Sequence, residues 1–123
     1  METSSKKILE ALPNFNDYLD TIEEIKKLNL RKMKLEAAIK QDESRNFVEV
    51  MTNPKYFVSG KAVPVSYYEN AYKYNGIDNN LTVLREELMA VCAELDAMKA
   101  RYDVYRQMQD MYKSIVYAER ALT

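Results

Sequence analysis

The sequence predicts an all-α protein: an antiparallel hairpin of two long, coiled-coil-like helices with an irregular insertion between them. Helix breakers are scarce, because the 123 residues include only three prolines and two glycines. Most of these breakers gather in residues 47–77, which leaves two uninterrupted stretches, 14–46 and 78–123. The last stretch repeats apolar residues at spacings of three and four. We therefore expect a single helical domain over 1–123, with residues 1–13 as an N-terminal arm.

The first long helix is expected to begin directly after Pro13. Asn14 or Asn16 offers a side-chain oxygen that accepts a hydrogen bond from a free N–H group of the first turn. Acidic residues come early in this stretch and basic residues come later, an order that matches the helix dipole. The acids are Asp17, Asp20, Glu23 and Glu24, and the bases are Lys26, Lys27, Arg31, Lys32 and Lys34.

The second long helix carries the clearest periodic pattern in the chain. Asp78 or Asn79 is expected to cap it. Five heptads of a and d positions follow, and all of them are apolar except Gln109. This 3.5-residue period predicts a coiled-coil seam that packs on the first helix. The seam consists of Leu81, Leu84, Leu88, Val91, Leu95, Met98, Tyr102, Tyr105, Tyr112 and Val116.

A second apolar face runs along the same helix, away from the seam. A single hairpin covers only one face, so the sequence predicts a further partner helix here, from this chain or from another copy. Four alanines continue the face upstream, and their high helix propensity on an exposed surface is an alternative explanation for that part alone. The predicted second interface consists of Val104, Met108, Met111, Ile115 and Leu122.

The insertion is expected to hold a short β-hairpin and a short helix. Two β-prone runs, 55–58 and 61–65, flank Ser59-Gly60, a pair that suits a tight hairpin turn. Ser66 and Glu69 then have the spacing of a capping box, which predicts a two-turn helix over 67–74. Asn75-Gly76 is expected to turn the chain into the last helix.

The composition argues against most enzyme classes. The chain has no histidine and one cysteine, so it lacks the commonest general base and offers no internal disulfide or thiolate zinc site. Its two glycines cannot form a GxGxxG motif or a Walker loop. Cys92 is interpreted as a small buried hydrophobe, with an intersubunit disulfide as the alternative. We expect no enzymatic activity, no metal and no cofactor.

Two groups of residues are candidates for contact with a partner or with phosphate. Lys27, Arg31 and Lys34 share one helix face in a run without acids, although nearby glutamates favour a solvated or salt-bridged face. Tyrosines of the insertion suit an interface or a core. A formal net charge of −1 argues against nucleic acid as the partner. The tyrosines in question are Tyr67, Tyr68 and Tyr72.

The sequence also bears on location. No apolar stretch approaches the roughly 20 residues of a membrane span. The apolar run near the N-terminus is too short for a signal peptide. We therefore expect no membrane association and a location in the cytoplasm or inside an assembled particle such as a virion.

The order of elements resembles that of prefoldin chaperone subunits. In that plan two long coiled-coil helices are joined by β-hairpin material, and the likeness spans the whole chain as an element order without a shared residue motif. It implies a holdase activity. The short helix over 67–74 and the second apolar face depart from the plan.

These observations favour a non-catalytic helical protein that acts through protein–protein contacts. A small helical hairpin buries a modest fraction of its surface, and a last helix with two apolar faces favours a homo-oligomer or a subunit of a larger complex. A virion or other particle component, a scaffold and an adaptor all fit. The alternatives are a small phage-encoded type of inhibitor or regulator of a host complex, and a prefoldin-like holdase.

Overall fold

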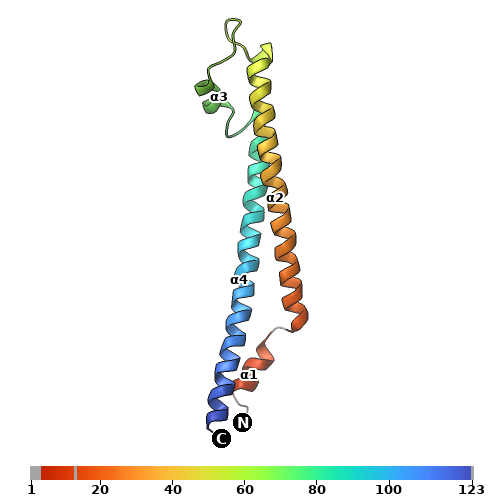
Figure 1. Ribbon diagram of the computed structural model, residues 1–123, viewed down its shortest axis with the longest axis vertical. Coiled ribbons are helices and arrows are strands. Elements are labelled where there is room, and N and C mark those ends of the chain that lie inside the picture. The colour runs from red at the N-terminus through yellow and green to blue at the C-terminus, as the bar shows by residue number, and fades with distance from the viewer. Residues whose placement is uncertain (1–3, 13, 123) are drawn as a thin grey trace. The chain divides into compact units, whose positions relative to one another are not determined.

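The computed structural model describes residues 4–12 and 14–122 of the chain (Figure 1). The all-α class is confirmed, because 85% of the structure is helical, its two long helices pack against each other, and the described residues form no sheet. The elements in chain order are α1 (Ser4–Ala11), α2 (Phe15–Thr52), the 3₁₀ helix η1 (Pro54–Tyr56), α3 (Val65–Ala71), the 3₁₀ helix η2 (Ile77–Asn79) and α4 (Asn80–Ala121).

The chain divides into two compact units, and both long helices contribute to each of them. One unit, here called the terminal unit, comprises Met1–Leu28 and Glu94–Thr123. The other, here called the insertion unit, comprises Asn29–Ala93. Each unit is described by itself below.

The start of α2 has the cap that the sequence predicts. Asn14 Oδ1 accepts a hydrogen bond from the Asp17 N–H at 2.9 Å, and Asp17 Oδ2 accepts one from the Asn14 N–H at 3.1 Å. This reciprocal pair satisfies two backbone donors that the first helical turn would otherwise leave open. The expectation of a cap at Asn14 is therefore confirmed.

The end of α2 lies at Thr52 rather than near residue 46. The extra turn and a half bury Val50, which is 0% exposed. No breaker intervenes until Pro54, which disfavours helical geometry in the residue before it. Asn53 then caps η1, because its side chain accepts a hydrogen bond from the Lys55 N–H at 3.0 Å.

The expected β-hairpin of the insertion does not form. Val58 and Lys61 exchange two backbone hydrogen bonds of 2.9 and 3.1 Å, and this one bridge is all that remains of the hairpin. Ser59 and Gly60 both have positive φ, as a tight hairpin turn requires. The flanking runs stay irregular because Val58 is 63% exposed, and an isolated pair of strands without a buried face is marginal in water.

The expected caps of the short helix and of α4 are corrected as well. The short helix is α3, and Ser66 lies inside it rather than capping it. Pro64 occupies the N-cap without a side-chain hydrogen bond, since its fixed φ of −59° already suits the approach to a helix. At the start of α4, Asp78 and Asn79 have positive φ and do not cap the helix.

The first turn of α4 is satisfied by Asn75 and Asn80 instead. The carbonyl oxygen of Asn75 accepts hydrogen bonds from the N–H groups of Leu81 and Thr82, at 3.1 and 3.3 Å. The Oδ1 atom of Asn80 accepts a further bond from the Leu81 N–H at 2.9 Å. Free donors at this helix end are thereby paired.

In the insertion unit the segments of α2 and α4 run antiparallel. Successive positions along α2 contact earlier positions along α4: Arg31 with Glu87, Glu43 with Arg85, and Asn46 with Asn80. The insertion closes over the end of α2, and α3 lies beside that end (Figure 1). The hydrophobic core of the insertion unit contains the buried Val50, Val63 and Tyr68, with Met51, Tyr56, Tyr72 and Ile77 packed around them.

In the terminal unit the helices meet through tyrosines. The Tyr18 hydroxyl donates a hydrogen bond of 2.8 Å to the backbone carbonyl of Tyr105, and the two rings pack edge to face at 5.2 Å. Burial raises the pKa of Tyr18, and neighbouring Tyr102 and Tyr105 raise it further. Helix α1 lies alongside the C-terminal part of α4 (Figure 1), with Leu9 and Leu12 beside Tyr112.

Candidate functional site

The seam face of α4 is covered by packing within the chain. All ten predicted seam residues are buried or partly buried. Leu81, Val91 and Leu95 have at most 2% of their surface exposed. Gln109, the one polar residue of the pattern, is exposed. This face therefore supplies packing and is not an available binding surface.

The second apolar face of α4 lies at the surface of the terminal unit. We call Val104, Met108, Met111, Ile115 and Leu122 the α4 stripe. Val104 is 51% exposed, Met111 is 55% exposed and Leu122 is 88% exposed. Met108 and Ile115 are partly buried. Their spacings of three, four and seven place all five on one face of the helix, about 27 Å long.

The α4 stripe has the spacing of a second coiled-coil seam. Met108, Ile115 and Leu122 are seven residues apart, and so are Val104, Met111 and Ala118. The two series alternate by four and three, which is the pattern of knobs that insert into holes of a facing helix. An apolar face of this kind at the surface of a protein usually marks an interaction site.

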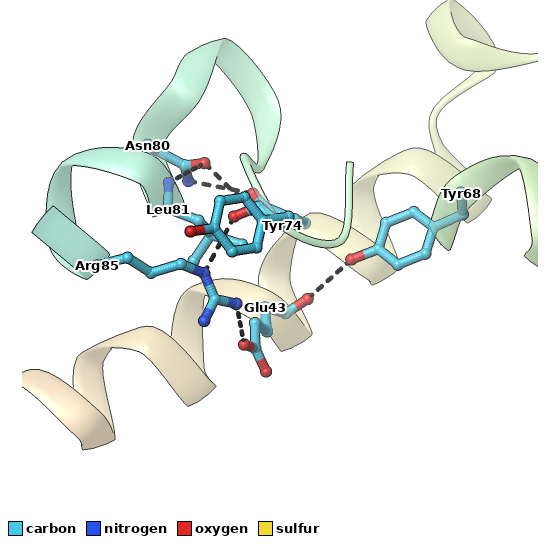
Figure 2. Close-up of polar contacts among 7 residues, drawn as sticks. Glu43, Tyr68, Tyr74, Asn80, Leu81 and Arg85 are labelled. Carbon is cyan, nitrogen blue, oxygen red and sulfur yellow. Dashed lines mark hydrogen bonds and ion pairs between the residues drawn. The ribbon is translucent and has the colours of Figure 1, made fainter. Parts of the chain in front are cut away.

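A polar junction ties the insertion to the two long helices in the insertion unit. Figure 2 shows Arg85 of α4 directed at both Glu43 of α2 and Tyr74 of the insertion. Its Nη2 donates to Glu43 Oε1 at 2.6 Å, its Nε donates to the Tyr74 carbonyl at 3.0 Å, and its guanidinium lies 5.1 Å from the Tyr74 ring centre. The Arg85 side chain thus joins α4, on which it stands, to α2 and to the insertion.

Next to this junction lies a buried amide pair. Asn46 is only 4% exposed, and its side-chain amide exchanges two hydrogen bonds of 3.2 Å with Asn80. Gly76 packs against the pair with φ +76° and ψ −170°. A Cβ atom at Gly76 would overlap Asn80 Oδ1 and lie 2.8 Å from Asn46 Nδ2. The turn before α4 therefore depends on glycine for both conformation and space.

The tyrosines predicted as partner contacts divide between core and surface. Tyr68 is 5% exposed, donates a hydrogen bond of 3.3 Å to the Glu43 carbonyl and packs edge to face on Phe47. Burial raises its pKa, and the charge of Glu43 adds to the effect. Tyr72 is partly buried against Tyr68, whereas Tyr67 is 52% exposed. Of these three, only Tyr67 has the exposure that a contact needs.

The basic residues predicted as contacts are all at the surface. Arg31 donates a hydrogen bond of 2.8 Å to Glu87 of α4 in the insertion unit. Lys34 of the same unit is exposed, and Lys27 of the terminal unit is exposed. This ion pair joins the two long helices through an acid that is far from Arg31 in sequence, and at an exposed position it contributes little to stability.

The structure also contains two open grooves that the sequence pattern did not reveal. They lie on either side of Val48, which is 58% exposed near the end of α2. One groove, of about 450 Å³, is lined by Phe47, Val65 and Tyr68 among others. The other, of about 840 Å³, is lined by Tyr56 and Ile77 among others. They arise from the way the insertion folds over α2, which the periodicity of either helix does not report.

The described residues offer few other candidates for catalysis or metal binding. Cys92 is a partly buried free thiol. Within the described part of the chain no three acidic or cysteine side chains gather as metal ligands would. Among residues 4–12 and 14–122, no helix combines the length and the apolar character that crossing a membrane requires.

No protein-family model, curated protein or solved structure matches this chain.

Proposed function

We propose that this chain is a non-catalytic helical assembly or adaptor protein and that the α4 stripe is its association surface. The exposure of this apolar face carries the proposal. Val104, Met111 and Leu122 each have half or more of their surface open to solvent, while the seam face of the same helix is covered. A helix that is apolar on two sides is ordinarily buried on two sides.

The energetics favour a protein partner for this surface. Burial of apolar area contributes roughly 25 cal/mol per Å², so covering the exposed parts of these side chains is favourable by several kcal/mol before the losses of association. Methionine is enriched in the centres of protein interfaces, and its flexible thioether adapts to a facing surface. The stripe contributes two methionines to this surface.

A subunit of a larger particle, including a virion, and an adaptor between two proteins both fit this proposal. The holdase alternative loses part of its basis, because the likeness to prefoldin includes β-hairpin material that is reduced here to the bridge between Val58 and Lys61. The inhibitor alternative would use the same kind of surface with a foreign protein. The experiment below separates it from self-assembly by the mass of the complex.

Met111→Lys is expected to weaken association at least about ten-fold, because the interface would have to bury an unpaired ammonium group. Helicity should stay unchanged, since Met111 is 55% exposed within the chain. Association is measured by mass photometry, both on the purified protein and in extracts of cells that produce it naturally. Circular dichroism checks the fold.

Tyr117→Lys is the matched control. Tyr117 is a large side chain on the same helix, is 71% exposed and does not belong to the stripe. Its replacement should leave association intact. The proposal is overturned if Met111→Lys leaves every complex of the wild-type chain unchanged, or if both substitutions disrupt them equally.

A further inference from the structure

The turn that leads from the insertion into α4 contains the one Asn-Gly pair of the sequence, Asn75-Gly76. We propose that this pair is a modification site: Asn75 deamidates spontaneously to aspartate or isoaspartate through attack by the Gly76 nitrogen, and the closed turn holds the reaction back. The site lies wholly in the insertion unit. It is therefore independent of the α4 stripe and of the proposed function.

The reaction needs only the chain and water. The backbone nitrogen of Gly76 bonds to the side-chain carbon Cγ of Asn75 and loses its proton to solvent, which closes a succinimide ring. The side-chain amide nitrogen takes up a proton and leaves as ammonia. Water then adds to either ring carbonyl and opens the ring to aspartate or isoaspartate. Glycine is the least hindered residue for this attack because it has no Cβ atom, and Asn75 is exposed to water.

Hydrogen bonds hold both reacting groups in the closed turn. The Gly76 N–H donates to the Tyr72 carbonyl at 2.7 Å, and Asn75 Oδ1 accepts from the Thr82 hydroxyl at 3.0 Å. The Asn75 carbonyl also accepts from the N–H groups of Leu81 and Thr82, which holds the peptide plane in place. Ring closure requires the nitrogen and Cγ to meet in a near-attack geometry. The turn therefore has to open before the reaction proceeds.

Conversion to isoaspartate disrupts the turn, because the former Cβ atom becomes an additional atom of the main chain. The turn is too crowded to accept it: a Cβ atom at Gly76 would already overlap Asn80 Oδ1 and lie 2.8 Å from Asn46 Nδ2. The Asn75 carbonyl that accepts from the first turn of α4 becomes part of a free carboxylate. The isoaspartyl chain, separated by chromatography, should therefore unfold at a lower urea concentration than the unconverted chain.

The full-length chain tests the site by itself. It is incubated in mildly alkaline buffer with and without urea, and peptide mass spectrometry measures the conversion of each asparagine. In urea Asn75 should convert first, ahead of Asn70, which is exposed but precedes Ala71. Without urea the conversion of Asn75 should be at least about ten-fold slower, because only the opened turn reacts.

A pair of variants tests the role of the Thr82 hydroxyl. Thr82→Val removes it at nearly constant volume and should speed the conversion of Asn75 about five-fold, the factor that one ordinary hydrogen bond represents. Thr82→Ser keeps a hydroxyl and should stay within about two-fold of the wild-type rate. Circular dichroism verifies that both variants fold.

The proposal fails if Asn75 converts as fast without urea as with it, or if another asparagine converts first in urea. A folded Thr82→Val chain that converts no faster than wild type would show that the hydroxyl does not protect Asn75. The comparison with and without urea uses the wild-type chain alone, so it decides the proposal even where a variant does not fold.

Discussion

Gly76→Ala is expected to lower the free energy of unfolding by about 3–5 kcal/mol. The backbone at Gly76 has φ +76° and ψ −170°, a region that residues with a Cβ atom essentially avoid. The added methyl group would overlap Asn80 Oδ1 and lie 2.8 Å from Asn46 Nδ2 and 2.9 Å from Leu81 Cγ. The buried amide pair would have to separate, which leaves polar groups without partners. Urea denaturation followed by circular dichroism measures the loss.

Gly60→Ala is the control for a positive φ without crowding around the added methyl group. Gly60 also has a positive φ, +75°, but a Cβ atom there would meet nothing within 4 Å. Its substitution should cost about 1–2 kcal/mol, the conformational penalty alone. The difference between the two variants therefore reports the packing of Gly76 on Asn46 and Asn80 together with the extra conformational penalty of its ψ of −170°. Equal losses would contradict that packing.

Leu95→Asp is expected to destabilise the protein by about 4 kcal/mol or more, or to unfold it. Leu95 is 2% exposed at the centre of the seam. The substitution removes a buried apolar side chain and places a carboxylate at a position almost closed to water. Guanidinium denaturation and circular dichroism give the loss of stability and of helicity.

Gln107→Asp is the matched control on the exposed surface of the same helix, and it should change stability by only about 0.5 kcal/mol or less. Leu88→Asp should fall between the two, because Leu88 is partly rather than fully buried. Wild-type stability in Leu95→Asp would show that the seam is not the contact between the long helices.

The long helices follow from signals that are local in sequence. The scarcity of glycine and proline, the heptad spacing of α4 and the side chain of Asn14 act within a few residues of where they stand. Helix periodicity also determines which side chains share a face, so the sequence alone predicts both the seam and the α4 stripe. The bounds of α2 were less accessible, because its last turns depend on the burial of Val50.

The structure of the insertion is harder to predict from the sequence, because it depends on tertiary contacts. The runs around Ser59-Gly60 have β-propensity, but propensity expresses itself only where a neighbouring strand or a buried face supports it. Ser66 and Glu69 match a capping box in spacing, yet the chain enters α3 through Pro64. The amide pair of Asn46 and Asn80 joins residues far apart in sequence, and no short-range signal announces it.

The sequence likewise does not predict which individual side chains are exposed to solvent. Tyr68 and Tyr67 are adjacent and chemically identical, but one is buried on Phe47 and the other lies open to solvent. The grooves beside Val48 result from the fold of the insertion over α2 and have no periodic signature. The α4 stripe differs because one continuous helix determines its face.

Methionine oxidation tests the association surface most directly, with controls inside the same chain. Met33, Met89 and Met111 are 66%, 67% and 55% exposed, so peroxide should oxidise them at similar rates in a lone chain. In the natural cell, mass spectrometry should find Met111 oxidised several-fold more slowly than Met33 and Met89, because a partner covers the α4 stripe. Equal oxidation of all three would contradict the stripe as the association surface.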